Sequence, residues 1–529
     1  MVLTQVTSHL KRRVTRLPRF NNTETPALHG KSVQWAQGLV LVVLFTTSVF
    51  FALRFDAVTD TDVWWHMAIG RWIVEHGAIP RTEPFSAFGA GKHFEAYSWL
   101  FELFVFWCYE KLGLVGIVVF SCAMTVSITA AVHHLVRRLN SSFLLGVVTT
   151  FLAVYTMGRL YTPRPWLASI LFFTLELDIL MQARKTRESR ELLWLPVIFV
   201  FWVNIHIQFV DGLVVLGIAL AEALVATRWS TIQTNLRAAK IMWVFLGCIL
   251  ATLINPYGPK IYKVAYDLVA QGAALPQIPE LSAISFRSLD DWCVLFFALA
   301  AAIVLARKNH PSFFEIALLA FSILTSFRSQ RDVWVLAIVG AAMLATGFAE
   351  QQADPFQLTV AAIPFVVLAS IAGGWFALLG KGINNTELQE KLSSSLPVRA
   401  VETIKQQRWE GPLYNDFGWG GYLIWSLQKP VSMYGKTSVY EVEMLLRSNA
   451  TWSGLAGWDS DPDLFAANLI IAPRGAPLIQ LLSLQPCLQS AYRDNVAEVF
   501  VSRSLSAADA ASSTSAFCTA RQTAANRPR

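Results

Sequence analysis

Apolar blocks close to the length that crosses a bilayer recur along most of this chain, and they constrain its fold more than any other feature. A transmembrane helix needs about 17–25 consecutive, mostly apolar residues. Only 15% of the 529 residues are charged, whereas soluble globular domains carry roughly 25%. The sequence therefore predicts an α-helical polytopic membrane protein. The blocks lie at 34–53, 114–136, 143–160, 166–182, 192–206, 208–227, 239–256, 291–306, 312–327, 332–348 and 358–379.

One further apolar block, at 97–113, carries three charged residues and fits either a short span or an amphipathic helix at the membrane interface. The distribution of Lys and Arg decides between the two, because short cytoplasmic loops retain positive charge. If this block lies flat, the basic loops fall on the same side as the basic N-terminal tail. We therefore predict about eleven spans, a cytoplasmic N-terminus and an extracytoplasmic C-terminal region. The basic loops are 136–138, 184–190, 228–240 and 307–308.

The pattern changes after Lys381, where short runs typical of strands predict a small α/β domain. These runs are 411–427, 429–435, 467–475 and 496–504. Cys487 and Cys518 fall in this region and would pair if it faces an oxidising compartment, and the sequence leaves that pairing open. The predicted segments are a basic cytoplasmic tail (1–33), a first span (34–53), a first outer loop with two interfacial helices and the candidate site (54–113), the remaining spans (114–380), the α/β domain (381–503) and a disordered tail (504–529).

Charge and motif content exclude several classes of function. The net charge of +7 comes largely from the segment 11–20 and the basic loops, so it indicates membrane orientation and not nucleic-acid binding. The chain has no P-loop or Rossmann phosphate motif. A pump or channel would place polar residues at the membrane midplane, and most of these spans carry none. The polar residues gather instead on the predicted outer face: Arg159, Arg164, Asn204, His206, Asn255, Arg328 and Arg331.

The stretch TDTDVWWHMAIGRWIVEHG, residues 59–77, follows the first span and has helical spacing. Asp60 and Asp62 stand at its start, where a carboxylate caps a helix or is favoured by the helix dipole. Because one helix needs only one capping residue, the capping interpretation applies to Asp62 in preference to Asp60. The functional interpretation is that an acid here takes a proton from an acceptor hydroxyl or holds a divalent cation against a phosphate.

The order of short motifs along residues 40–503 resembles the GT-C membrane glycosyltransferases. The motifs are D-x-WWH-x-x-x-GRWI-x-x-HG-x-IP, W-x-N-x-H, NPYG and WGGYLIW, and together they are similar to a bacterial branch of that superfamily. The resemblance implies a polyprenyl-phosphate or polyprenyl-diphosphate sugar as donor. It also implies that Asp60 or Asp62 is the base or the metal-binding acid, and the D-x-WWH pattern favours Asp62. His66, four residues on, either assists Asp62 or simply pairs with it.

A lipid-phosphate donor needs cations, and we expect Arg164, Arg328 and Arg331 to bind its phosphate unless they only snorkel at the interface. Asn204 and His206 either face the cavity or form the turn between two spans. No cofactor is certain; a divalent metal ion held by Asp62, His66 and His206 is chemically plausible.

The C-terminal domain is expected to contribute no catalytic residue, because the related branch has Asp-Gly-Arg where this chain reads Tyr434–Gly435–Lys436. Trp419, Tyr422 and Trp425 fit a core strand better than sugar-stacking platforms. The leading hypothesis is a glycosyltransferase of the bacterial inner membrane that transfers a lipid-linked sugar to a lipid, glycan or protein acceptor. The alternative is a non-enzymatic transporter or assembly factor for cell-envelope glycans.

Overall fold

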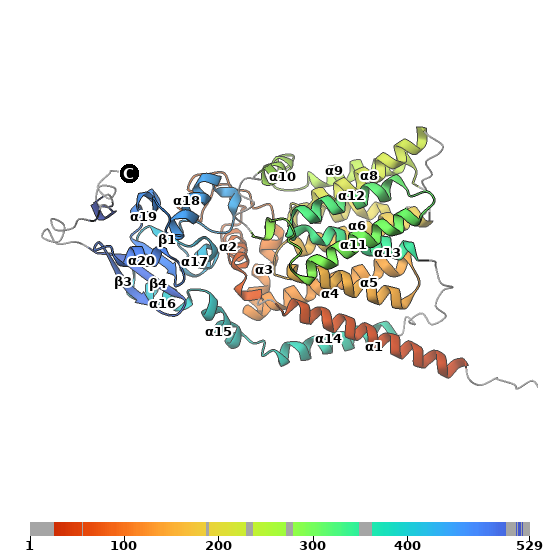
Figure 1. The fold of residues 1–529 in the computed structure, drawn as a ribbon, viewed down its shortest axis with the longest axis horizontal. Coiled ribbons are helices and arrows are strands. Elements are labelled where there is room, and N and C mark those ends of the chain that lie inside the picture. The colour runs from red at the N-terminus through yellow and green to blue at the C-terminus, as the bar shows by residue number, and fades with distance from the viewer. Residues whose placement is uncertain are drawn as a thin grey trace, which may run out of the picture.

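The structure of the chain, a computed structural model, describes residues 26–54, 57–186, 190–228, 236–270, 279–348, 362–503, 515, 517–519 and 521. A helical bundle and a smaller mixed domain lie at opposite ends of the long axis (Figure 1). Most of the predicted tail 1–33 lies outside the described residues, although its last part belongs to the first helix, which begins at Pro26.

Every one of the predicted apolar blocks contains a helix of the bundle. Within the described residues, five helices are long and apolar enough to cross a membrane, or up to six if α14 and its bent continuation α15 form one span. The chain is thus a multi-pass membrane protein, and the count of eleven spans stays a prediction. The helices are α1 (Pro26–Ala52), α4 (Leu114–Leu139), α5 (Phe143–Thr156), α6 (Trp166–Thr186), α7 (Leu195–Ile205), α8 (Phe209–Arg228), α9 (Ala238–Thr252), α11 (Leu289–Arg307), α12 (Phe313–Arg328), α13 (Val333–Gly347) and α14 (Ala362–Gly380).

Helix α13 lies at the centre of the bundle. Nearly all of its residues are buried, and it packs against α4, α5, α11 and α12. A helix that is apolar on every side is typical of a protein core or a membrane span. At the edge of the bundle, α1 and α14 lie side by side (Figure 1).

The first outer loop forms the two predicted short helices, α2 (Thr61–His76) and α3 (Trp99–Leu112). Helix α2 lies between α3 and the C-terminal domain, and residues 63–70 are all buried (Figure 1). Two glycines permit this close packing. A Cβ on Gly70 would lie 2.2 Å from the Glu102 carbonyl oxygen, and one on Gly421 would lie 2.7 Å from that of Thr61. Helix α2 is therefore a packed layer between the two parts of the molecule.

The C-terminal part contains one four-stranded sheet in the order β1-β2-β4-β3. Strands β1 and β2 are parallel, while β4 is antiparallel to both β2 and β3. The helices and strands of this part are α15 (Asn385–Ser395), α16 (Val398–Gln407), β1 (Leu413–Asn415), α17 (Gly420–Leu427), α18 (Val442–Trp452), α19 (Pro462–Ala466), β2 (Leu469–Pro473), α20 (Leu478–Ser483), β3 (Leu488–Arg493) and β4 (Ala497–Ser502). Short 3-10 turns are η1 (Ala57–Thr59), η2 (Gly158–Leu160), η3 (Glu191–Trp194), η5 (Pro279–Leu281), η6 (Gln330–Asp332), η7 (Phe417–Trp419), η8 (Thr437–Val439) and η9 (Trp458–Ser460).

The strand predictions are correct for β2 and β4 and wrong for most of 411–435. Only Leu413–Asn415 is a strand there, and α17 follows it. The helix forms because its apolar residues pack onto α2 and α3: the rings of Tyr422 and Trp64 meet edge to face at 5.2 Å, and Trp425 packs on Tyr109 at 5.0 Å. The aromatic residues of this segment accordingly pack as core, as expected. Strand β3 had not been predicted.

Cys487 and Cys518 form a disulfide, which the sequence had left open. Cys518 belongs to the segment 504–529, for which disorder was predicted. Most of that segment lies outside the described residues, but Phe517 and Cys518 are buried against the C-terminal sheet domain. At these two positions the chain is ordered because the disulfide and apolar packing hold it.

Candidate functional site

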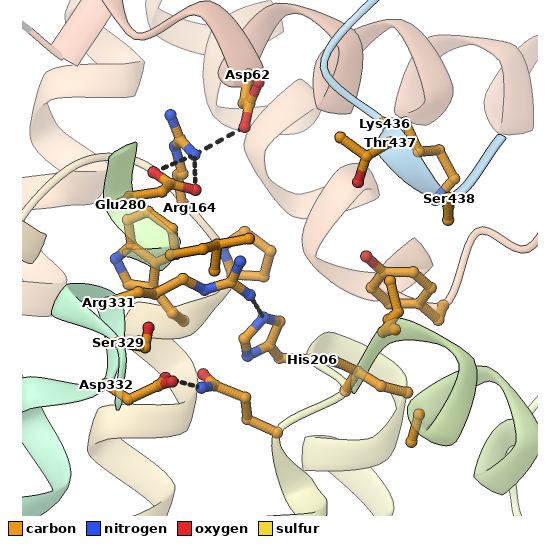
Figure 2. A pocket seen from close by; sticks show the side chains of 18 of the residues that line it. Asp62, Arg164, His206, Glu280, Ser329, Arg331, Asp332, Lys436, Thr437 and Ser438 are labelled. Atoms are coloured by element: carbon orange, nitrogen blue, oxygen red, sulfur yellow. Dashed lines mark hydrogen bonds and ion pairs between the residues drawn. The ribbon is translucent and has the colours of Figure 1, made fainter. Parts of the chain in front are cut away.

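A cavity of about 890 Å³ lies where the helical bundle meets the C-terminal domain. Its walls come from the start of α2, the loop before α6, the start of α8, the helix α10 (Lys260–Ala270), η5, η6 and the loop at 435–438. Figure 2 shows that charged side chains from separate elements point into this space. Segments distant in the sequence therefore build one site.

Asp60 and Asp62 both bind the guanidinium of Arg164. Arg164 Nε lies 2.9 Å from Asp60 Oδ2, and Nη1 lies 2.7 Å from Asp62 Oδ2 and 3.1 Å from Glu280 Oε2 (Figure 2). Asp60 also caps α2, because its side chain accepts a hydrogen bond from the Asp62 backbone N–H at 2.9 Å. The assignment of the cap to Asp62 before Asp60 is therefore wrong. A carboxylate that precedes the first helical residue is the one that can reach the free N–H groups.

The pKa of Asp62 is raised to about 6. Burial is the largest cause, and the negative charges of Asp60 and Glu280 add to it, while Arg164 opposes the shift. The Asp62 side chain remains 20% exposed and lines the cavity. A carboxylate with this pKa is mostly ionised at neutral pH and is a stronger base than an ordinary aspartate.

His66 does not pair with Asp62. Its Nδ1 lies 3.2 Å from Glu102 Oε1 on α3, and both side chains are buried. Burial lowers the pKa of His66, with Lys436 and Arg164 adding to the effect, and burial raises that of Glu102 to about 8. Both groups are therefore uncharged near neutral pH. The helical spacing placed His66 and Asp62 on one face, but the tight crossing of α2 and α3 provided a nearer partner.

Arg331 and His206 meet on the opposite wall of the cavity. Arg331 Nη2 lies 3.5 Å from His206 Nε2, and the guanidinium stacks 5.2 Å from the ring centre of Trp166. His206 Nδ1 is 2.8 Å from Ser169 Oγ. Arg328 is exposed and also lines the cavity. Among the described residues, neither arginine forms an ion pair with a carboxylate, so both charges remain available to an anion.

Asn204 does not line the cavity. Its Oδ1 accepts a hydrogen bond from Trp99 Nε1 at 2.7 Å, and its Nδ2 donates to the carbonyls of Val200 and Ile254 at 2.7 and 2.8 Å. Of the two alternatives for Asn204, the structure does not support the one in which it faces this cavity. Its amide instead ties α3 to α7 and to the end of α9, because a buried amide needs all of its polar atoms satisfied.

Three important residues were missed by the sequence analysis. Glu280 completes the set of acids around Arg164, and Glu102 orients His66. Lys436, from the domain expected to contribute no catalytic residue, is only 4% exposed and lines the cavity. The Gly-Lys step was visible in the sequence, but only the docking of the C-terminal domain onto α2 brings Lys436 to the site.

The acidic residues do not form a set of metal ligands. Across the part of the chain that the structure describes, no group of three or more His, Cys, Asp or Glu side chains is placed to hold a metal ion. The three carboxylates converge on the guanidinium of Arg164, while His66 and His206 are engaged by Glu102 and Ser169. The proposed set of Asp62, His66 and His206 therefore does not fit a divalent cation.

Solved structures of known proteins are similar to this chain. No protein-family model and no curated protein matches the chain. The archaeal oligosaccharyltransferase AglB from Archaeoglobus fulgidus, solved with an inhibitory peptide and a dolichol-phosphate, is similar with 11% identity and a TM-score of 0.51 over 84% of this chain and 69% of that chain. ArnT from Cupriavidus metallidurans, bound to undecaprenyl phosphate, is similar with 14% identity and a TM-score of 0.47 over 90% and 98% of the two chains. The likeness to AglB shows that the two chains share a fold.

Proposed function

We propose that this protein is a glycosyltransferase of the bacterial inner membrane. It moves a sugar from a polyprenyl-(di)phosphate-linked donor to a lipid, glycan or protein acceptor at the outer face. One observation carries the proposal. The same large cavity is lined by Asp62, whose pKa is raised, and by Arg328 and Arg331, which form no ion pair with a carboxylate of the described residues. The fold that holds this cavity is shared with AglB. The dolichol-phosphate in the AglB complex is consistent with a lipid-phosphate donor for this fold.

Asp62 is the proposed general base. An acceptor hydroxyl or amine in the cavity gives its proton to the Asp62 carboxylate while its oxygen or nitrogen bonds to the anomeric carbon of the sugar. Arg164 holds Asp62 Oδ2 at 2.7 Å and so orients the carboxylate. The proton then passes from Asp62 to water, because the side chain is partly exposed.

Arg328 and Arg331 are proposed to bind the leaving group. The bond between the anomeric carbon and the phosphate oxygen breaks, and the lipid phosphate leaves with an additional negative charge. Guanidinium groups stabilise phosphate by charge-assisted, often bidentate hydrogen bonds. Arg164 was also expected to contact the phosphate, but its guanidinium is engaged by three carboxylates. We therefore assign it to the positioning of Asp62.

The test is transfer of radiolabelled sugar from a panel of polyprenyl-phosphate and polyprenyl-diphosphate sugars in membranes that contain the full chain. The Asp62→Asn variant should lose transfer by about 100-fold or more, since an amide cannot accept the proton. The Asp60→Asn variant should retain transfer, because asparagine is an equally good helix cap.

Asp459→Asn is the matched control, since Asp459 is exposed on the C-terminal domain and does not line the cavity. It should transfer sugar at the wild-type rate. If no donor is consumed, and Asp62→Asn restores the envelope of a deletion strain as well as wild type does, the transferase proposal is wrong. That outcome would favour an assembly factor or transporter.

A further inference from the structure

Lys436 is a buried cation that forms no ion pair with any carboxylate of the described residues. It extends from the loop before η8 and lines the cavity (Figure 2). Its Nζ lies 4.5, 4.9 and 5.5 Å from the ring centres of Tyr97, Phe94 and Trp65. Among the described residues, its side chain makes no ion pair and no hydrogen bond. Aromatic faces compensate only part of the cost of removing an ammonium from water, so a further partner is expected.

Glu83 and Glu102 interact electrostatically with Lys436, but neither forms an ion pair with it. Glu83 accepts hydrogen bonds from the backbone N–H groups of Phe85 and Ser86 and from the hydroxyl of Tyr434, at 2.7, 3.0 and 2.9 Å. The pKa of Glu102 is about 8, so this group is mostly protonated at neutral pH. Lys436 lines the cavity, where an anionic ligand would complete the environment of its ammonium.

The two residues after Lys436 add hydrogen-bond donors to the same wall. The side chains of Thr437 and Ser438 line the cavity, and neither hydroxyl has a hydrogen-bond partner among the described residues (Figure 2). One ammonium and two hydroxyls on consecutive residues suit a tetrahedral oxyanion, which accepts several hydrogen bonds at once.

Gly435 places this loop against the proposed base. A Cβ at this position would lie 2.2 Å from Asp62 Oδ1 and 2.9 Å from Trp65 Nε1, so any larger residue would have to displace these side chains. An anion bound by the loop is therefore next to the carboxylate that would activate the acceptor. A donor phosphate held there would bring its sugar into the cavity that Asp62 also lines.

We propose that Lys436, Thr437 and Ser438 form a phosphate-binding loop for the polyprenyl-linked donor, contributed by the C-terminal domain. The identity of the ligand as the donor rests on the proposed function, whereas the binding of a lipid phosphate can be measured without any transfer. The loop acts together with Arg328 and Arg331 on the other wall, and it makes binding of the donor depend on correct docking of the two parts of the molecule.

The experiment measures binding of radiolabelled undecaprenyl phosphate to the purified full chain in nanodiscs of phosphatidylcholine. Lys436→Met keeps an unbranched apolar side chain between the aromatic rings and removes the charge. It should weaken binding by about tenfold or more, while Lys436→Arg should weaken it less. Lys92→Met is the matched control, because Lys92 pairs with Glu441 outside the cavity, and it should bind as wild type does.

Competitors separate the possible sources of the phosphate. Unlabelled undecaprenyl phosphate should displace the probe, whereas equal concentrations of inorganic phosphate or phosphatidylglycerol should not. Undecaprenol should bind wild type and Lys436→Met equally, because it lacks the phosphate. Displacement by inorganic phosphate as effective as by the lipid would assign the loop to free phosphate and overturn the proposal.

The proposal also fails if Lys436→Met has the thermal stability of wild type and binds undecaprenyl phosphate as tightly. If Lys436→Met does not fold, the double variant Thr437→Val, Ser438→Ala tests the same loop outside the aromatic cage and should also weaken binding. If wild type never transfers sugar but Lys436→Met binds undecaprenyl phosphate more weakly than wild type, the transferase proposal is wrong and the binding-loop proposal stands. If wild type transfers sugar and Lys436→Met binds undecaprenyl phosphate as wild type does, the transferase proposal stands and the binding-loop proposal is wrong.

Discussion

Arg164 shows how one side chain sets the chemistry of its neighbours. Three carboxylates surround it, and the pKa of Asp62 is raised to about 6. Asp60 serves two purposes, because it caps α2 and shares the same guanidinium. The sequence indicated that one of the two aspartates is the functional acid. Their separate roles depend on Arg164 and Glu280, which are more than 100 residues away in the chain.

Sugar transfer should depend on pH through Asp62. The rate should rise as pH increases through about 6, because the carboxylate must lose its proton before it can act as a base. Arg164→Gln removes the positive charge that lowers the pKa of Asp62, so this midpoint should move to higher pH. Asp60→Asn removes a negative charge that raises the pKa, so the midpoint should move to lower pH. The measurement is the pH–rate profile of each variant, and identical profiles in all three proteins would rule out Asp62 as the titrating group.

At the scale of elements, the packing of α2 decides where the site residues lie. Helix α3 contacts one side of α2 and α17 contacts another, so His66 meets Glu102 and Asp62 meets Gly435. The apolar spacing of residues 59–77 predicted a helix correctly. It suggested an interfacial helix with a polar side, whereas residues on most sides of α2 are buried between other elements.

Gly70→Ala should destabilise the protein by about 1–3 kcal/mol, because the added methyl group overlaps the α3 backbone and the two helices must separate. The melting temperature in detergent should fall by several degrees. Gly217→Ala on α8 is the matched control: its nearest foreign atom would lie 3.9 Å away, and alanine favours a helix. Equal melting temperatures for the two variants would contradict a tight α2–α3 crossing.

At the scale of the whole molecule, the C-terminal domain completes the cavity that begins in the first outer loop. Lys436 reaches the site only because α17 and the 435–438 loop dock onto α2. The Cys487–Cys518 disulfide fits the predicted extracytoplasmic position of this domain, because such bonds persist in oxidising compartments.

The predicted orientation can be tested with reporter fusions. Alkaline phosphatase joined after residue 503 should be active, and β-galactosidase at the same point should be inactive, because the domain is expected outside the cytoplasm. The opposite activities would show that the topology is inverted.

The Cys487–Cys518 disulfide makes a separate prediction. In membranes isolated without reductant, alkylation should detect Cys487 and Cys518 only after reduction, and a Cys487→Ala, Cys518→Ala variant should lose about 2–4 kcal/mol of domain stability.

The sequence by itself determined the membrane class, the positions of the apolar helices and the presence of a helix directly after the first span. These features are local: hydrophobic length and helical spacing act between neighbouring residues. Tertiary structure alone decided that His66 pairs with Glu102 and that most of WGGYLIW is a helix. It also brought Lys436 into the cavity. These outcomes depend on contacts between distant segments, whose geometry is set by how glycines and apolar faces pack and not by local spacing.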